Sequence, residues 1–204
     1  MIHKPKLIVI EGLDGSGKST QAALLSAKLT AADIPHICTR QPSDGSIGKM
    51  ARSFTQGDYG NLANETVALL FAADRVQHYN EEIAPALASG KWVICDRYYY
   101  SNMAYQGVDD NAMERVIAYN QAVMGRKSPD VIFFLDVPPG DCMYRIESTR
   151  QEISIFEALP QLAAQRARFF AAFERLKEDD NVVVVETCGL TPEGVSDKIW
   201  GELF

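Results

Sequence analysis

The sequence predicts an α/β protein in which helices cover both faces of a five-stranded parallel sheet, a three-layer α/β/α arrangement. Short runs rich in apolar and β-branched residues alternate with longer segments whose apolar residues recur every three or four positions. The short runs are nearly continuous in apolar residues, as is typical of strands covered on both faces. No internal repeat, low-complexity tract or linker interrupts this alternation, so residues 1–204 are expected to form a single domain.

The predicted strands and helices follow one another along the chain in the order of a parallel sheet. Strands are expected near residues 6–11, 35–38, 91–96, 131–137 and 182–187. Residues 61–88 keep helical spacing as far as Pro85 and stop at Gly90, which predicts one long helix with a late bend. Residues 159–176 predict a second long amphipathic helix. The polar, irregular residues 144–157 precede it and predict a short lid.

The composition excludes several classes of protein. The longest apolar runs span four or five residues, far fewer than the ~20 that cross a bilayer, so no membrane partner is expected. The N-terminus lacks the features of a secretory signal, which favours a cytoplasmic location. The net charge of −7 argues against a nucleic acid polymer as a partner, because binding one needs a broad basic face. The four cysteines form no C-x-x-C pair and are expected to be free, mostly buried thiols.

Residues 12–19 carry the strongest motif, Gly-Leu-Asp-Gly-Ser-Gly-Lys-Ser, which matches the P-loop pattern G-x-x-x-x-G-K-[ST]. The motif follows a predicted strand and opens a helix near Lys18, as a P-loop requires, so the P-loop NTPase fold is expected. In such a loop the backbone N–H groups face phosphates, Lys18 reaches the β- and γ-phosphates, and the Ser19 hydroxyl binds Mg²⁺. The residues expected to bind ATP are Gly12, Leu13, Asp14, Gly15, Ser16, Gly17, Lys18, Ser19 and Thr20.

Two predicted strands end in an aspartate that could be the second metal ligand. Asp96 is favoured because Arg97 follows it directly, so a metal-side carboxylate and a phosphate-side guanidinium would share one strand end. Asp136 comes before two prolines and is expected to cap the next helix. The metal site is therefore predicted at Ser19 and Asp96.

A P-loop alone does not define the reaction, since GTPases, ATPases and small-molecule kinases share it. The sequence contains no N-K-x-D motif for guanine, and Asp96 is not followed by the D-x-x-G pattern of GTPases. A kinase that acts on a phosphorylated acceptor needs a second anion site. Arg40, Arg75 and Arg97 could form it. Each arginine alone is more readily interpreted as a surface residue in a salt bridge, but Arg40 and Arg97 both follow predicted strand ends on the P-loop side of the sheet, which favours the site for the set.

Taken together, these segments resemble the thymidylate kinase family of P-loop nucleoside monophosphate kinases over essentially the whole chain. The resemblance rests on residues 11–20, on Thr-Arg-Gln-Pro at 39–42, on Leu-Phe-Ala-Ala-Asp-Arg at 70–75, on Asp-Arg-Tyr at 96–98 and on Ser-Asn-Met-Ala-Tyr-Gln-Gly at 101–107. It implies transfer of the γ-phosphoryl group of ATP to dTMP with Mg²⁺, giving dTDP and ADP in dTTP biosynthesis. A homodimer is typical of the family.

The resemblance also implies roles for individual residues. Arg75 would hydrogen-bond the thymine edge, Phe71 would stack on the ring, and Arg97 would hold the acceptor phosphate. Asn102 would contact the base, and Tyr105 would crowd the 2′ position of the sugar. Without the resemblance, Phe71 and Tyr105 read as core residues and Asn102 as a helix cap. The substrate-binding residues expected are Asp14, Arg40, Pro42, Phe71, Arg75, Arg97, Ser101, Asn102, Tyr105 and Gln106, with Asp14 near the acceptor 3′-hydroxyl.

The chain departs from the family pattern at two positions. Gln41 stands where the family usually has glutamate, which removes a negative charge beside the phosphates. Gly15 stands where some members carry a P-loop arginine, so the lid is expected to supply the catalytic cation through Arg145 or Arg150. The catalytic residues expected are Lys18, Arg97, Asp14, Arg145 and Arg150.

Two other functions compete with this interpretation. A P-loop deoxynucleoside kinase would need a carboxylate base, for which Glu11 is available just before the P-loop. An ATP-binding regulatory module without turnover would have no need for the intact set of Lys18, Ser19, Asp96 and Arg97.

Overall fold

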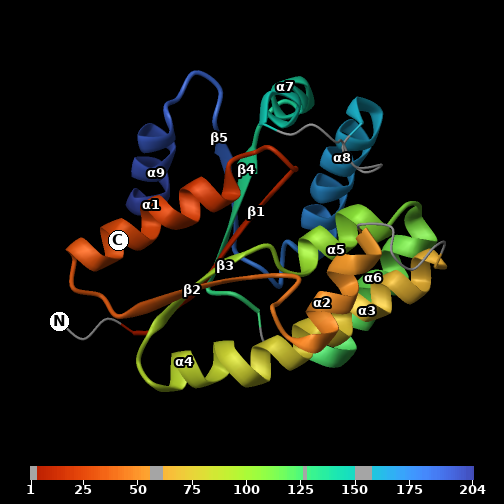
Figure 1. Ribbon diagram of the computed structural model, residues 1–204, viewed down its shortest axis with the longest axis horizontal. Helices are drawn as coiled ribbons and strands as arrows, with labels where there is room; N and C mark the ends of the chain where they lie inside the picture. The colour runs from red at the N-terminus through yellow and green to blue at the C-terminus, as the bar shows by residue number, and fades with distance from the viewer. Residues whose placement is uncertain (1–3, 56–61, 126–127, 150–157) are drawn as a thin grey trace.

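The computed structural model describes residues 4–55, 62–125, 128–149 and 158–204. Its centre is a five-stranded sheet of order β2-β3-β1-β4-β5 in which all neighbouring strands are parallel (Figure 1). The sheet confirms the α/β class and the five predicted strands. The strands are β1 (Leu7–Gly12), β2 (His36–Arg40), β3 (Trp92–Asp96), β4 (Val131–Asp136) and β5 (Val182–Glu186).

Helices cover both faces of this sheet. Helices α1 and α9 pack together on one face, and α3, α5 and α8 lie on the other (Figure 1). The helical segments are α1 (Lys18–Ala31), α2 (Ser46–Thr55), α3 (Asn64–His78), the π-helical turn η1 (Tyr79–Ile83), α4 (Ala84–Ala88), α5 (Tyr99–Gln106), α6 (Asp110–Met124), α7 (Pro139–Thr149), α8 (Leu159–Leu176) and α9 (Pro192–Gly201).

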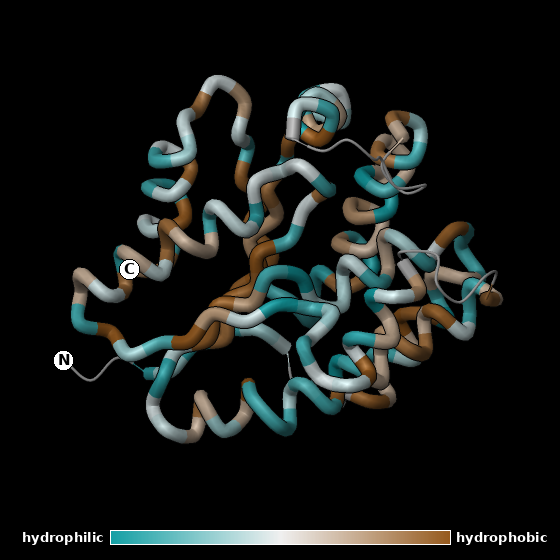
Figure 2. The backbone as a smooth tube through the Cα atoms, viewed as in Figure 1, coloured by the Kyte–Doolittle hydropathy of each residue, from teal (hydrophilic) through white to brown (hydrophobic). Residues whose placement is uncertain are grey.

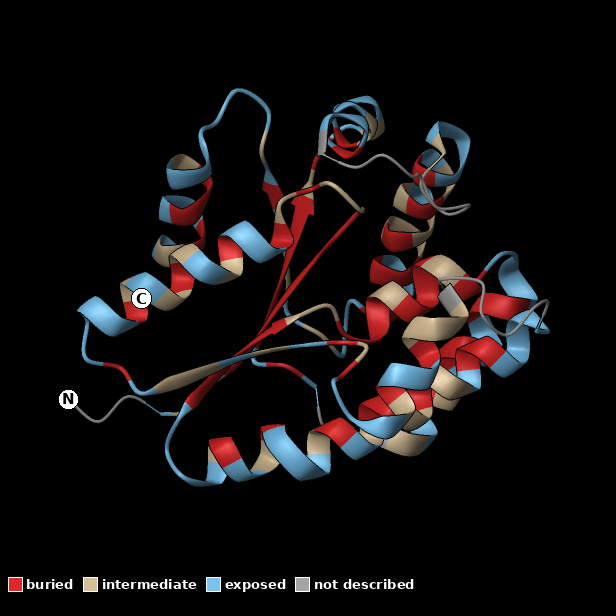
Figure 3. Cartoon of the chain, in the orientation of Figure 1, coloured by how far each residue is buried: buried red, intermediate tan, exposed pale blue. Residues whose placement is uncertain are grey.

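The core is divided in two by the sheet. Side chains alternate between the faces of a strand, so Leu7 and Val9 join the cluster under α5 and α8, whereas Ile8 and Ile10 join the cluster under α1 and α9. Figure 2 shows the central strands as hydrophobic, and Figure 3 shows them as buried. Burial on both faces explains why the runs that form the inner strands contain almost no polar residue.

The predicted long helix is present in the described part of the range, from Asn64 to Ala88, and it contains a π turn. The N–H of Ala84 donates to the carbonyl of Tyr79, five residues earlier. Pro85 lacks an N–H and crowds the carbonyl four residues before it, which disturbs the regular α-helical ladder at this point. The irregularity expected near Pro85 therefore lies in the turn just before it.

The irregular structure predicted for residues 144–157 is not found in the first part of this range. Helix α7 continues through Thr149, so residues 144–149 are helical rather than irregular. Cys142 and Ile146 are spaced by one helical turn and are both buried, which gives this polar stretch an apolar face. Residues 150–157 of the predicted lid, including Arg150, lie outside the described residues.

Two further expectations can be compared with the structure. Cys95 and Cys142 are buried, whereas Cys38 and Cys188 are exposed, and all four are free thiols. The prediction of mostly buried thiols therefore holds for half of them. Within the described ranges, no helix combines the length and the apolar character that crossing a membrane requires.

Candidate active site

The carboxyl ends of the parallel strands meet at one edge of the sheet and bring the predicted site residues together. Ile10 of β1 and Arg40 of β2 both pair with Asp96 of β3, so the loops that follow these strands are neighbours. A cavity of about 1110 Å³ opens there. Its lining includes most of the predicted residues: Asp14, Gly15, Ser16, Gly17, Lys18, Ser19, Thr20, Arg40, Pro42, Phe71, Arg75, Asp96, Arg97, Ser101, Asn102, Tyr105, Gln106 and Arg145. Gly12 and Leu13 do not line it.

The P-loop needs glycine at position 15 for two reasons. Gly15 has a φ of +77°, a conformation that L side chains rarely adopt. A Cβ atom at this position would also lie 2.6 Å from the carbonyl oxygen of Cys142 on α7. The close approach of α7 therefore leaves no room for a side chain in the loop.

Lys18 is buried at the start of α1. Its Nζ donates to the carbonyl oxygens of Gly12, at 3.1 Å, and Leu13, at 2.7 Å. Burial, together with the nearby positive charge of Arg97, lowers the pKa of Lys18 to about 8. The ammonium group is thus held by neutral carbonyls, which phosphate oxygens could replace as partners.

Ser19 and Asp96 form a pair suited to Mg²⁺. The Ser19 hydroxyl donates to Oδ2 of Asp96 at 2.8 Å, and Oδ1 of Asp96 is buried without a hydrogen-bond partner in the described part of the chain. Hydroxyl and carboxylate oxygens are ligands that Mg²⁺ accepts, usually in company with substrate phosphates. Among the described residues, no cluster of three or more His, Cys, Asp or Glu side chains could hold a metal by itself.

Asp136, the competing candidate, is engaged elsewhere. Both of its carboxylate oxygens accept from the Arg166 guanidinium of α8, at 2.7 Å each. The expectation that Asp136 caps the next helix is therefore wrong within the described residues. A bidentate ion pair links the end of β4 to α8 instead.

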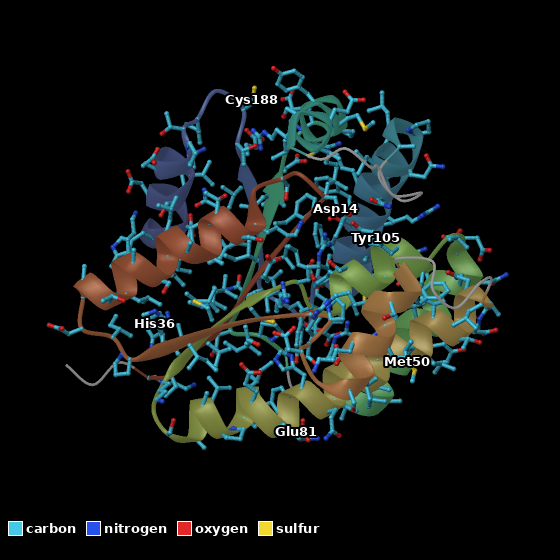
Figure 4. All side chains as sticks on the ribbon, viewed as in Figure 1. Asp14, His36, Met50, Glu81, Tyr105 and Cys188 are labelled. Carbon is cyan, nitrogen blue, oxygen red and sulfur yellow. The ribbon has the colours of Figure 1, made fainter. Side chains whose placement is uncertain are left out.

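Arg97 lies in an unusual backbone conformation beside the P-loop. Its φ of +71° is uncommon for a residue with a side chain. The guanidinium pairs with Asp14 through Nη2 and donates through Nη1 to Ser101, at 3.1 Å, and Tyr105, at 3.5 Å. Burial acts to lower the pKa of Arg97, but Asp14 together with Tyr105, Asp96 and Glu11 outweighs it, and the pKa is raised. Figure 4 shows Asp14 and Tyr105 side by side, and the Tyr105 hydroxyl donates to Oδ2 of Asp14 at 2.6 Å.

Glu11 fixes the backbone around Arg97. This side chain is 0% exposed, and burial raises its pKa. Its Oε1 accepts from the backbone N–H groups of Tyr98, at 2.8 Å, and Ser101, at 3.1 Å, and its Oε2 accepts from the Ser101 hydroxyl at 2.6 Å. The residue before the P-loop therefore holds both sides of the turn from β3 into α5.

Arg75 is buried and held by oxygens that carry no charge. Its Nε donates to Oε1 of Gln41 at 2.9 Å, and its Nη2 donates to the Tyr98 carbonyl at 3.1 Å. Its Nη1 donates to the side-chain oxygens of Asn120 and, at 3.4 Å, Asn102. Burial lowers the pKa of Arg75. The guanidinium is oriented by the hydrogen bonds that it donates to these four oxygens.

The remaining predicted residues occupy different parts of the cavity wall. Arg40 is exposed and pairs with Asp44 at 3.0 Å. Arg145 donates to the carbonyl of Gly15 at 3.3 Å, which brings α7 against the P-loop. The Asn102 amide donates to Oε1 of Gln106 at 3.0 Å, so these two side chains are tied to each other on α5.

Several residues at the site have no counterpart in the sequence-based prediction. Asn120 lies on α6 and contacts Arg75. Arg52 and the loop between β5 and α9 also line the cavity, the loop through Thr187, Leu190 and Pro192. The loop could have been predicted, because it follows a strand at the ligand-binding edge of a parallel sheet. No local pattern marks Asn120 or Arg52.

By fold and by site, the chain is a P-loop nucleotide-binding protein whose cavity carries a second cationic site at Arg97. A family model described as thymidylate kinase matches residues 10–199. The chain belongs to the thymidylate kinase family, a family of ATP-dependent kinases.

Individual relatives agree with the family match over most of their length. A thymidylate kinase of Leptospira borgpetersenii is 38% identical over 168 residues, which cover 82% of this chain and 81% of the relative. A probable thymidylate kinase of Thermococcus kodakarensis is 36% identical over 88% of this chain and 91% of its own. A thymidylate kinase of Carboxydothermus hydrogenoformans is 37% identical over 89% and 88%.

Glu11→Ala should lower the free energy of unfolding by roughly 2–5 kcal/mol, because it leaves the buried N–H of Tyr98 and the part-buried N–H of Ser101 without their acceptor, each costing about 1–3 kcal/mol. Glu11→Gln keeps an acceptor oxygen and should cost markedly less. Urea denaturation of both variants measures the difference. Equal stability of the two variants would show that the carboxylate does not hold the turn.

The lowered pKa of Lys18 predicts proton uptake on ATP binding. Phosphate oxygens raise the pKa of a nearby ammonium group, so above about pH 8 a partly neutral Lys18 must gain a proton when ATP binds, and ATP affinity should fall as the pH rises. Titration calorimetry in two buffers of different ionisation enthalpy measures the uptake. Lys28→Met, on the same helix, should retain it. A binding enthalpy independent of the buffer above pH 8 would contradict the prediction.

Proposed function

We propose that this protein is a thymidylate kinase that transfers the γ-phosphoryl group of ATP to dTMP and releases dTDP and ADP. The observation that carries the proposal is one cavity lined by a P-loop, by the Arg97 guanidinium and by the buried Arg75 with Phe71. Such a cavity can hold a donor phosphate, an acceptor phosphate and a pyrimidine base together. Family membership supports the same reaction.

The P-loop side of the cavity suits the donor. Lys18 and the backbone N–H groups at the start of α1 would bind the β- and γ-phosphates. Ser19 and Asp96 would hold Mg²⁺ with the phosphates, and the ion when bound would offset negative charge on the transferring group. The carbonyl partners of Lys18 leave its charge available for a phosphate without breaking an ion pair.

Arg97 suits the acceptor phosphate. Its neighbours Asp14, Ser101 and Tyr105 restrict the guanidinium to one position, and a fixed planar fork can bind two phosphate oxygens at once. Asp14 belongs to the P-loop and also pairs with Arg97, so the two anion sites are linked through one side chain. Tyr105, held by Asp14, would limit space at the sugar 2′ position.

Arg75 suits a base carbonyl. A guanidinium has five N–H donors, and the oxygens of Gln41, Asn102, Asn120 and Tyr98 account for four of them within the described part of the chain. One Nη2–H remains in a side chain that lines the cavity. Thymine and uracil offer a carbonyl oxygen to such a donor, whereas cytosine offers an amino group in the same place. Phe71, also on the cavity wall, would stack on the base.

The reaction needs no strong general base, because the acceptor phosphate is already an anion at neutral pH. Catalysis then consists of alignment and charge neutralisation. This argues against a deoxynucleoside kinase that uses Glu11, since both oxygens of Glu11 accept hydrogen bonds from the turn after β3 and its side chain is fully buried. A regulatory module without turnover is not favoured by the family either.

A cation from α7 would complete the charge balance. The P-loop has no room for an arginine at position 15, and Arg145 already contacts the Gly15 carbonyl. These two contacts support Arg145 as the catalytic lid arginine. The lid near 144–157, the roles of Arg150 and Arg40, the single domain over 1–204, the homodimer and the cytoplasmic location stay predictions.

Arg97→Lys should lower kcat/KM for dTMP at least about tenfold, because a point charge replaces a bidentate fork worth roughly 1.5–3 kcal/mol. Steady-state kinetics with dTMP and ATP test it. Arg115→Lys changes an arginine that pairs with Glu65 on the surface and should keep full activity. A loss below about twofold in Arg97→Lys would exclude a grip on the acceptor phosphate.

Arg145→Ala should lower kcat by about tenfold or more while leaving the KM for dTMP within about twofold, because the charge acts mainly in the transition state. Tyr144→Ala, at the exposed neighbouring position of α7, is the matched control. An unchanged kcat would assign the catalytic cation to another residue.

Substrate choice tests the proposed function as a whole. The thymine methyl group can contribute only about 1–3 kcal/mol in an apolar pocket, so deoxyuridylate should be a weaker but real substrate. Deoxycytidylate should be worse, because its amino group would face the Arg75 donor. Uridylate should fall behind deoxyuridylate if Tyr105 fills the 2′ space. Measured kcat/KM values for thymidylate, deoxyuridylate, deoxycytidylate and uridylate give the order, and a preference for a cytosine or purine monophosphate would refute the thymidylate assignment.

A further inference from the structure

A chain of buried hydrogen bonds leads away from Arg75 to a histidine outside the cavity lining. Nε of Arg75 donates to Oε1 of Gln41 at 2.9 Å, and Nε2 of Gln41 lies 3.2 Å from Nδ1 of His78. The three residues are 2%, 5% and 3% exposed. His78 is one helical turn after Arg75 on α3, and Gln41 follows β2, so two elements close the chain.

The chemistry of these groups fixes the direction of each bond. A guanidinium only donates, so the amide oxygen of Gln41 must face Arg75. The amide nitrogen then faces His78, and an NH₂ group only donates. Nδ1 of His78 must therefore carry a lone pair, which leaves the ring proton of the neutral imidazole on Nε2.

The surroundings of the other ring nitrogen agree with this tautomer. Nε2 of His78 lies 2.8 Å from the Thr39 hydroxyl and 3.2 Å from a carboxylate oxygen of Glu82. Both oxygens can accept a hydrogen bond from an Nε2 that carries the proton. The groups that face His78 thus come from β2, from the loop after it and from η1, and all are compatible with a donor at Nε2 and an acceptor at Nδ1.

The opposite orientation of Gln41 would be costly. It would place the amide NH₂ against the Nε–H of Arg75, two donors facing each other in a buried position, and each would lose its partner. The partners that accept from Arg75 in the described part of the chain are amide and carbonyl oxygens. Hydrogen-bond direction, rather than an ion pair, therefore sets how the guanidinium points.

We infer that His78 is a positioning residue for base recognition: its Nδ1 lone pair fixes the Gln41 amide, which in turn fixes the Arg75 guanidinium that faces the base. The hydrogen-bonded chain from His78 through Gln41 to Arg75 is called the relay below. The inference rests on the proposed function for the role of Arg75, but the orientation of the side chains in the relay does not depend on it. The relay acts on nucleotide binding and not on the transferring phosphate.

The relay predicts a specific change at His78 in the variant Gln41→Glu. A glutamate carboxylate at this position would accept from Arg75, but it has no N–H to offer His78. Nδ1 of His78 must then carry a proton to bond to it. One substitution therefore changes the protonation of a ring atom on a different element.

The first experiment measures the chemical shifts of the ring nitrogens by NMR of protein labelled with ¹⁵N-histidine, without any substrate. The chain has three histidines, and the His78 signals are those lost in His78→Asn. Above neutral pH, Nδ1 of His78 should show the shift of a nitrogen without a proton in the wild type, and that of a proton-bearing nitrogen in Gln41→Glu. His36, the control within the spectrum, should not change. A proton on Nδ1 in the wild type, or no change in Gln41→Glu, overturns the inference.

The second experiment separates positioning from general structural support by kinetics. His78→Leu removes the acceptor and should raise the KM for dTMP about three- to tenfold, the loss of one hydrogen bond, with kcat and the KM for ATP within about twofold. His78→Asn places an amide oxygen near the position of Nδ1 and should restore most of the KM. A fall in kcat at unchanged KM, or no rescue by asparagine, overturns the relay.

The outcomes distinguish the inference from the proposed function. If His78→Leu does not fold, the NMR comparison and the kinetics of Gln41→Glu decide, since the glutamate variant keeps an acceptor for Arg75. If the wild-type protein phosphorylates no pyrimidine monophosphate, the proposed function fails. The ring-nitrogen shifts then still decide whether His78 orients Gln41.

Discussion

The buried carboxylate of Glu11 is the interaction on which the arrangement of the site depends. Glu11 lies on β1 directly before the P-loop, and it accepts three hydrogen bonds from the turn that leads from β3 into α5. That turn carries Arg97 in its left-handed backbone conformation. One carboxylate therefore links the P-loop to the turn that carries Arg97, the arginine that we propose for the acceptor phosphate. These donors offset part of the cost of burying it, although its pKa stays raised.

Lys18 and Arg97, two cationic groups of the cavity, differ in the partners that hold them. Lys18 is held by backbone carbonyls and has a lowered pKa, so its charge is available to an incoming phosphate. Arg97 is paired with Asp14 and keeps its charge at all working pH values. The chain has a net charge of −7, but Lys18 and Arg97 concentrate positive charge inside the cavity. The protein can therefore bind phosphates without a broad basic surface.

The part of the cavity around Arg75, where we propose that the base binds, uses neutral amides where a carboxylate would be the simpler partner for a buried arginine. Amide groups have a donor end and an acceptor end, so a correct network requires every member to be oriented. Gln41, Asn102 and Asn120 are oriented by Arg75 on one side, and Gln41 is oriented by His78 on the other. Neutral partners leave more of the guanidinium's positive potential for a carbonyl of the base, because no carboxylate cancels it.

The sequence alone determined the five strands, the P-loop and the full extent of α8. It also predicted most of the residues that line the cavity. Each of these features follows from local periodicity, from a short motif or from a family pattern. The tertiary structure decided the features that need distant residues to meet. Asn120 lies 45 positions from Arg75, and His78 lies 37 positions from Gln41. Asp136 meets Arg166 of α8, and residues 144–149 become helical because Ile146 is buried beside the P-loop. A local pattern carries no information about such partners, since packing between elements chooses them.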